Sequence, residues 1–91
     1  MAKVTDMVAR VTDLEARVRS ENEWVNLAKG MLRAEMTRRA ITYEQLAEKL
    51  AEVGVKDTAV NIRNKVARGG FTAAFFLQCL KAIGVKELRL D

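Results

Sequence analysis

The sequence predicts an all-α fold, a bundle of four to five helices preceded by a short coiled-coil-type helix. Three observations support this fold class. The 91 residues contain no proline and only five glycines, so little in the chain interrupts a helix. Apolar residues recur at helical spacing, and a strand-like alternation is confined to residues 85–90. Near its beginning, the chain repeats itself with a period of seven residues.

The first predicted helix covers residues 3–19 and contains the heptads VTDMVAR and VTDLEAR. Its apolar side chains form a narrow stripe, which is typical of the contact between paired helices. The stripe consists of Val4, Met7, Val11, Leu14 and Val18. We therefore expect residues 1–20 to associate with another copy, as a homodimer or tetramer, beside a domain over residues 21–91. Valine at the first heptad position favours two parallel strands, while an antiparallel pair and a four-helix assembly stay open.

The second predicted helix covers residues 23–38, and two signals disagree about its beginning. Ser20 followed by Glu23 fits a capping box, which favours a break near residues 20–22. The heptad rhythm nevertheless continues through Val25, which favours one long helix; we prefer the break. The predicted apolar face consists of Trp24, Leu27, Ala28, Met31 and Leu32. Trp24 is interpreted as an anchor in the core or in the helix pair.

The third predicted helix has the clearest boundaries. Thr42 fits the N-cap position, and Gln45 stands three residues later, where it completes a capping box. Leu46 and Leu50 lie one turn apart on its apolar face. Gly54 suits the left-handed conformation that ends many helices.

Two further helices follow, and each has a capping residue at its start and a glycine at its end. The fourth spans residues 58–68, with Asp57 or Thr58 as its cap and Gly69 at its end. The fifth begins at Thr72 and stops at Gly84. Its apolar face consists of Phe75, Phe76, Cys79, Leu80 and Ile83.

The third and fourth helices, joined by the turn Gly54-Val55-Lys56-Asp57, form a helix-turn-helix candidate. On the second helix of such a pair, exposed side chains reach base edges in the major groove. Asparagine bonds adenine, and lysine or arginine bonds guanine. The predicted base-reading residues are Asn61, Asn64, Lys65 and Arg68. Residues 56–70 also carry four basic side chains against one acidic, so positive charge gathers around this helix.

A family resemblance supports this interpretation. The run ITYEQLAEKL, the glycine turn, the helix ending in ARGG and the apolar helix closing at AIGV resemble the Cro and lambda-repressor-like (Xre-type) helix-turn-helix domain. A closer resemblance, over residues 23–90, is to a small bacterial family of unknown function with the same core. The resemblance implies that residues 58–68 are the recognition helix and that Tyr43 stands near a phosphate-contacting position. We add Lys56 and Arg63 as phosphate contacts because of their charge.

Composition excludes several other functions. The chain has no histidine, no Gly-rich phosphate loop and no cysteine cluster, so we expect no enzyme, metal, cofactor or small-molecule substrate. The longest uncharged stretch, residues 69–80, is too short to cross a membrane. Cys79 lies in an apolar run and is expected to be a buried thiol. With no signal peptide evident, we expect a cytoplasmic protein.

Two functions remain in competition. The net charge of +4 and the helix-turn-helix candidate favour a DNA-binding transcriptional regulator that acts as a dimer or higher oligomer on double-stranded DNA. The alternative is an oligomeric protein-interaction module that uses the same scaffold without binding DNA. Glu44, Glu48 and Glu52 favour the alternative unless they face away from the phosphates.

Overall fold

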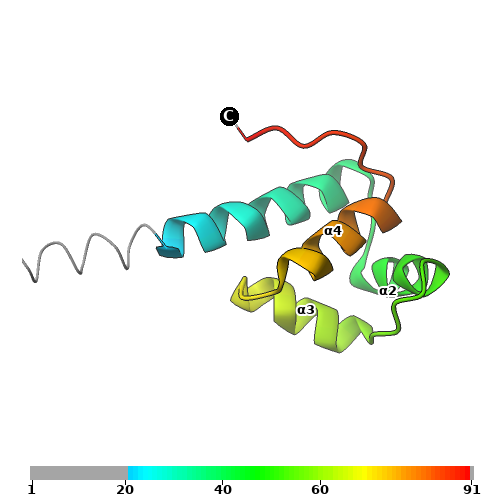
Figure 1. Cartoon of the computed structure of the whole chain (residues 1–91). Coiled ribbons are helices and arrows are strands. Elements are labelled where there is room, and N and C mark those ends of the chain that lie inside the picture. The colour runs from blue at the N-terminus through cyan, green and yellow to red at the C-terminus, as the bar shows by residue number, and fades with distance from the viewer. Residues whose placement is uncertain (1–20, 91) are drawn as a thin grey trace, which may run out of the picture.

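The computed structural model describes residues 21–90, which form four helices and no strand (Figure 1). We call the first, residues 21–38, the leading helix. It is followed by α2 (Tyr43–Glu52), α3 (Ala59–Arg68) and α4 (Ala73–Ala82). The all-α prediction is therefore confirmed for the described part of the chain.

The heptad segment lies outside the described residues. This applies to its predicted seam of Val4, Met7, Val11, Leu14 and Val18. It also applies to the question of whether a break near residues 20–22 separates two helices, because the description begins at residue 21, already within the leading helix.

The three short helices begin at the predicted threonine caps. The Thr42 hydroxyl accepts a hydrogen bond from the Gln45 backbone N–H at 3.1 Å, and the Gln45 side chain accepts one from the Thr42 N–H at 2.9 Å. This is a complete capping box. Thr58, rather than Asp57, caps α3, and Thr72 caps α4 in the same way. These caps satisfy backbone donors that a helix start otherwise leaves unpaired.

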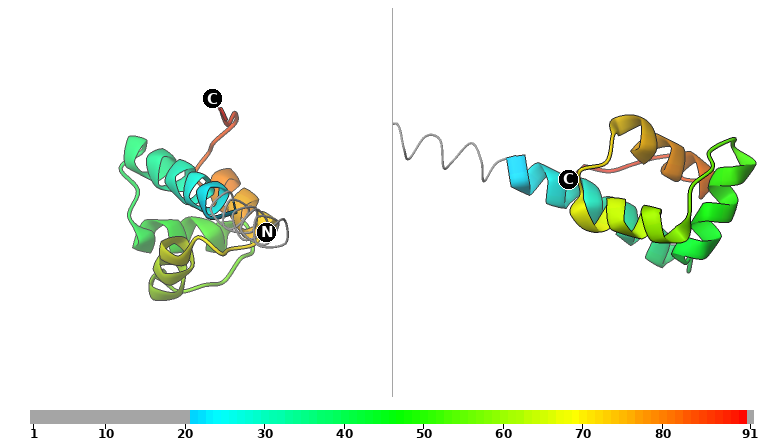
Figure 2. Two further views of the ribbon diagram at one scale, coloured as in Figure 1. Left: turned by 90° about the vertical axis from the view of Figure 1, so that its left-hand side faces the viewer. Right: turned by 90° about the horizontal axis from the view of Figure 1, so that it is seen from below.

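The core draws on all four helices. Its fully buried side chains are Leu32, Leu46, Leu50, Ile62, Val66 and Cys79. The leading helix, α3 and α4 run along the molecule, and α2 closes one end (Figure 2). Burial raises the pKa of Cys79 to about 12, so this residue is a packed thiol rather than a nucleophile.

The leading helix packs closely against the C-terminal end of α3. Gly69 ends α3 with φ 71°, in the left-handed region. A Cβ atom there would lie only 2.5 Å from Val25 Cγ1. The Lys29 ammonium also donates to the Ala67 carbonyl at 3.0 Å. Gly69 therefore serves both as the helix stop and as the contact point between two helices.

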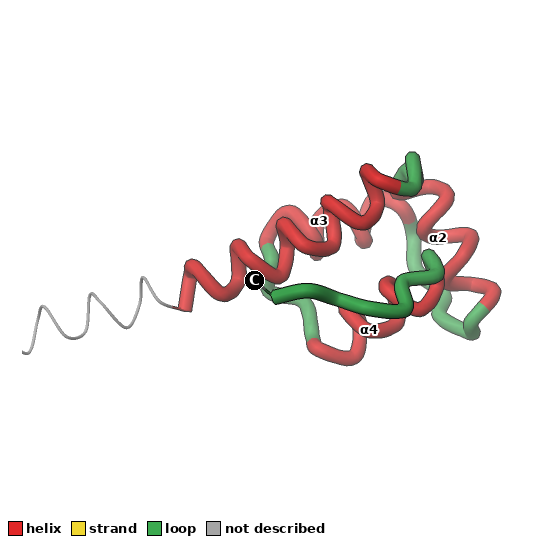
Figure 3. Tube along the Cα trace, turned by 90° about the horizontal axis from the view of Figure 1, so that it is seen from above, coloured by secondary structure: helices red, strands yellow, loops and turns green. Residues whose placement is uncertain are grey.

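Beyond α4 the chain becomes irregular. We call residues 85–90 the C-terminal tail; they run back alongside the leading helix (Figures 1 and 3). Val85 and Leu88 pack against the core, which holds the tail in place. The alternating sequence of this segment does not form a strand. No helix between residues 21 and 90 has the length and apolar character needed to cross a membrane.

Of the two roles predicted for Trp24, the one in the core is wrong within one chain, since the side chain is 66% exposed. Its role in a helix pair stays a prediction. Leu27 is exposed as well, whereas Leu32 and Met36 are fully or almost fully buried. The leading helix turns the side that holds Val25, Leu32 and Met36 toward α3 and α4. At about 100° per residue, Trp24 lies roughly a quarter turn away from that side. The predicted apolar face is therefore divided between the core and the surface.

Candidate nucleic-acid interface

The outer face of α3 carries three of the four predicted base-reading residues. Ile62 and Val66 are fully buried and fix the inner side of the helix. Asn61, Asn64 and Arg68 are exposed on the outer side. In Figure 1, α3 forms the lower edge of the molecule, so this side is turned away from the other helices. A long partner could therefore approach it without meeting the rest of the domain.

Lys65, the fourth predicted reader, is held on the flank of α3. Its ammonium contacts Asp57 Oδ2 at 2.5 Å and stands 4.8 Å from the centre of the Phe75 ring. The hydrogen bond from Lys65 lowers the pKa of Asp57 despite the opposing effect of burial. Asp57 also accepts from the Thr58 N–H, so the pair ties α3 to the turn before it. Lys65 positions the helix and would have to release Asp57 to contact a base.

This pair makes a prediction for acid stability. Because the folded state lowers the pKa of Asp57, ionised Asp57 stabilises the fold above the unfolded-state pKa near 3.8, and this stabilisation is lost as pH falls through the folded-state value. We expect Asp57→Asn to be less stable than wild type at pH 7, with the difference closing below pH 4. Urea unfolding at several pH values measures this. Glu48→Gln, at an exposed position, is the control and should leave the pH profile unchanged. Parallel wild-type and Asp57→Asn profiles would contradict the assignment.

Asn64 and Arg68 lie one helical turn apart and touch. Arg68 Nε donates to the Asn64 backbone carbonyl at 3.3 Å. This bond uses one guanidinium donor and leaves the two terminal nitrogens for a partner. The Asn64 and Arg68 side chains are therefore both exposed on the same face of α3.

Two of the three predicted phosphate contacts come together at the start of α2. The Arg63 guanidinium stands 5.6 Å from the centre of the Tyr43 ring, and Arg63 Nη2 lies 3.6 Å from Glu44 Oε1. All three residues line a hollow of about 430 Å³ that also includes Arg33. Lys56, the third, is exposed in the turn between α2 and α3. The cationic groups thus flank α3 rather than interrupt its outer face.

One surface residue was missed by the sequence analysis. Val60 is 61% exposed on the outer face of α3, one position before Asn61 and one turn before Asn64. A valine there can contact the methyl group of thymine. The sequence did indicate this residue, because Val60 is apolar and lies on the side of the helix where the helical period places polar residues.

The acidic residues of α2 do not all point toward the proposed interface. Glu44 pairs with Arg63, as described above. Glu48 and Glu52 line a different hollow, together with Ile83 at the end of α4, and no α3 residue lines it. Two of the three glutamates are therefore turned toward the α4 side of the domain.

Comparison with known proteins identifies one family. Residues 24–88 match the sequence model of a family described as a domain of unknown function (DUF6471). No curated protein matches the chain, and no solved structure matches it. The matched region covers α2, α3 and α4 completely and the leading helix from Trp24 onward, and it leaves out the heptad segment. It names no helix-turn-helix class, so the resemblance to Cro and lambda repressor stays a prediction.

Proposed function

The chain belongs to the family of the domain of unknown function DUF6471, and we propose that it is a DNA-binding transcriptional regulator. In this proposal α2, the turn and α3 act as a lambda-repressor-like helix-turn-helix on double-stranded DNA, as a dimer or higher oligomer. The observation that carries it is the outer face of α3, on which Asn61, Asn64 and Arg68 are exposed side by side.

The dimensions and anchoring of α3 support this role. An α-helix with its side chains is about 10–12 Å across, and the major groove is about 12 Å wide, so α3 can lie along the groove. The helix is fixed at its start by the Thr58 cap and the Lys65–Asp57 pair, and at its end by Gly69 against Val25. A rigid helix loses little conformational entropy when it presents its side chains to bases.

The distribution of positive charge also supports the proposal. Arg63 lies on one side of the buried line of Ile62 and Val66, and Lys65 lies on the other. A helix in the major groove has a phosphate backbone on each side, so cations are needed on both flanks. The Arg63–Glu44 pair is exposed, and such pairs contribute only about 0–1 kcal/mol. A phosphate could therefore replace Glu44 as the partner of Arg63.

Selection of bound sequences from a random duplex library, followed by salt titration of the best binder, tests the function. We expect enrichment of a defined sequence and binding at micromolar protein in low salt. The logarithm of the affinity should fall linearly with the logarithm of salt concentration. If Lys56 and Arg63 each neutralise one phosphate, the slope is about −2 for each chain. No enrichment, and no complex at low salt with any duplex, would overturn the proposal.

The alternative function, an oligomeric protein-interaction module without DNA binding, has one observation of its own. Trp24 and Leu27 are exposed on the leading helix, far along the chain from α3. Large exposed apolar side chains mark surfaces where proteins meet. The library selection separates the two functions, because only a DNA-binding protein enriches a sequence.

A further inference from the structure

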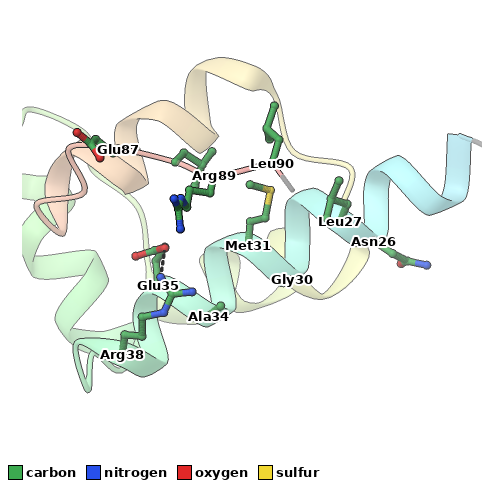
Figure 4. Close-up of a pocket in the computed structure, with 11 residues that line it drawn as sticks. Asn26, Leu27, Gly30, Met31, Ala34, Glu35, Arg38, Glu87, Arg89 and Leu90 are labelled. Atoms are coloured by element: carbon green, nitrogen blue, oxygen red, sulfur yellow. Dashed lines mark hydrogen bonds and ion pairs between the residues drawn. The ribbon is translucent and has the colours of Figure 1, made fainter.

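The C-terminal tail is an elongated segment without a neighbouring strand among residues 21–90 (Figure 3). The Val85 N–H donates to the Leu80 carbonyl at 2.9 Å, and Leu88 packs against the core. Within the described chain, the backbone of residues 86–90 forms no hydrogen bond to any other segment. The tail is also one wall of a groove of about 480 Å³ on the leading helix, and Arg89 and Leu90 leave it on opposite sides (Figure 4). Unpaired backbone groups of this kind are a template for pairing with another chain.

The tail has the alternating sequence of a strand, in which neighbouring side chains face opposite sides. In a strand, Lys86, Leu88 and Leu90 fall on one side, and Glu87 and Arg89 fall on the other. A strand also needs a neighbour that accepts and donates its backbone hydrogen bonds. One chain offers no such neighbour within residues 21–90, which is why the alternation does not produce a strand here.

Charge selects one way of pairing two tails. In a symmetric antiparallel pair, the residue at the twofold axis lies opposite itself, and residues equally far before and after it lie opposite each other. An axis at Lys86, Glu87 or Arg89 would place two like charges directly opposite, which is destabilising. An axis at Leu88 instead places Glu87 opposite the partner's Arg89, twice by symmetry. It also places Leu90, which is 72% exposed, opposite the partner's Lys86, whose aliphatic stem can cover it.

We propose that residues 86–90 of two copies of this chain pair as an antiparallel two-stranded ribbon with its twofold axis at Leu88. Backbone hydrogen bonds supply the attraction, and the two Glu87–Arg89 pairs fix the register, because exposed ion pairs are individually weak. Figure 1 shows the tail and α3 at opposite edges of the domain, so the ribbon leaves the outer face of α3 open. The ribbon is a second property of the molecule, independent of DNA binding and of the heptad segment.

Site-directed disulfide formation tests the pairing and its register. Lys86→Cys and Leu90→Cys are made in separate chains of different mass, mixed in equal amounts and oxidised mildly. Both positions are exposed, so neither change should disturb the fold. In the ribbon they lie opposite each other with Cα atoms about 4.5–5.5 Å apart, within the range of a disulfide. Two identical positions would be about 14 Å apart, four residues at about 3.4 Å each, which is beyond that range.

We expect the mixed disulfide to dominate, whereas random collision would give the two homodimers together as often as the mixed product. Wild type, whose only thiol is the buried Cys79, is the control and should give no product. Homodimers that together equal or exceed the mixed product would overturn the proposal, and so would the absence of any disulfide.

Charge exchange gives a second readout on the same pair of cysteine variants. Adding Glu87→Arg to both chains places like charges opposite each other, so the yield of mixed disulfide should fall several-fold. Adding Arg89→Glu to the same chains should restore the yield, because opposite charges then face each other again. Glu48→Arg, the same change at an exposed position of α2, is the matched control and should leave the yield unchanged. Equal yields with and without Glu87→Arg, or no recovery with Arg89→Glu, would contradict the ribbon. None of these outcomes depends on whether α3 binds DNA.

Discussion

Replacing Gly69 by alanine is expected to lower the free energy of unfolding by about 2–5 kcal/mol, measured by urea denaturation. Two costs add at this position. A non-glycine residue at φ 71° costs roughly 1–2 kcal/mol, because its Cβ approaches the backbone. The new methyl group would also lie 2.5 Å from Val25 Cγ1, and overpacking of this kind costs roughly 1–3 kcal/mol. Valine is branched at Cβ and cannot easily turn away.

Gly54→Ala provides the matched control for this prediction. Gly54 also has a left-handed φ, 85°, but a Cβ atom there would meet nothing within 4 Å. Its substitution should therefore cost only the backbone part, roughly 1–2 kcal/mol. Adding Val25→Ala to Gly69→Ala should recover part of the larger loss. If Gly69→Ala and Gly54→Ala lose the same free energy of unfolding, the close approach of the leading helix to α3 adds nothing to the cost of a side chain at residue 69.

Local chemistry explains which parts of the fold could be predicted. The threonine caps of α2, α3 and α4 depend on residues within three positions of each other, so the sequence contained their full description. The orientation of the leading helix depends on which side meets α3 and α4. Trp24 and Val25 are adjacent and both apolar, and in the folded chain Val25 is the one that approaches Gly69 while Trp24 stays exposed.

The same distinction applies to the candidate interface. Helical spacing alone placed Asn61, Asn64 and Arg68 on one exposed face, and it would have placed Val60 there too. Lys65 contacts Asp57, which lies eight positions earlier in the sequence. This contact depends on how the turn before α3 folds, so helical spacing alone could not predict it. The grouping of Arg63 with Tyr43 is likewise tertiary, since it joins α3 to α2.

The variant with both Asn64→Ala and Arg68→Ala is expected to lose sequence-selective DNA binding. A bidentate contact to a base supplies roughly 1–3 kcal/mol of discrimination, so losing two corresponds to about 30-fold or more in the affinity for the selected sequence. Both side chains are exposed, and surface changes of this type usually alter stability by no more than about 0.5 kcal/mol. Titration with the selected duplex and with a scrambled one, at one salt concentration, measures the loss.

Charge alone cannot produce this result, and a matched variant separates the two effects. Gln78→Ala with Lys81→Ala also removes one amide and one positive charge, from exposed positions on α4. It should weaken binding to both duplexes slightly and equally, because a lost cation acts through the phosphates without regard to sequence. The variant with Asn64→Ala and Arg68→Ala should instead bind the selected duplex and the scrambled duplex with similar affinities. If it still prefers the selected duplex as strongly as wild type, α3 does not read DNA through this face. The base contacts would then have to come from elsewhere in the protein.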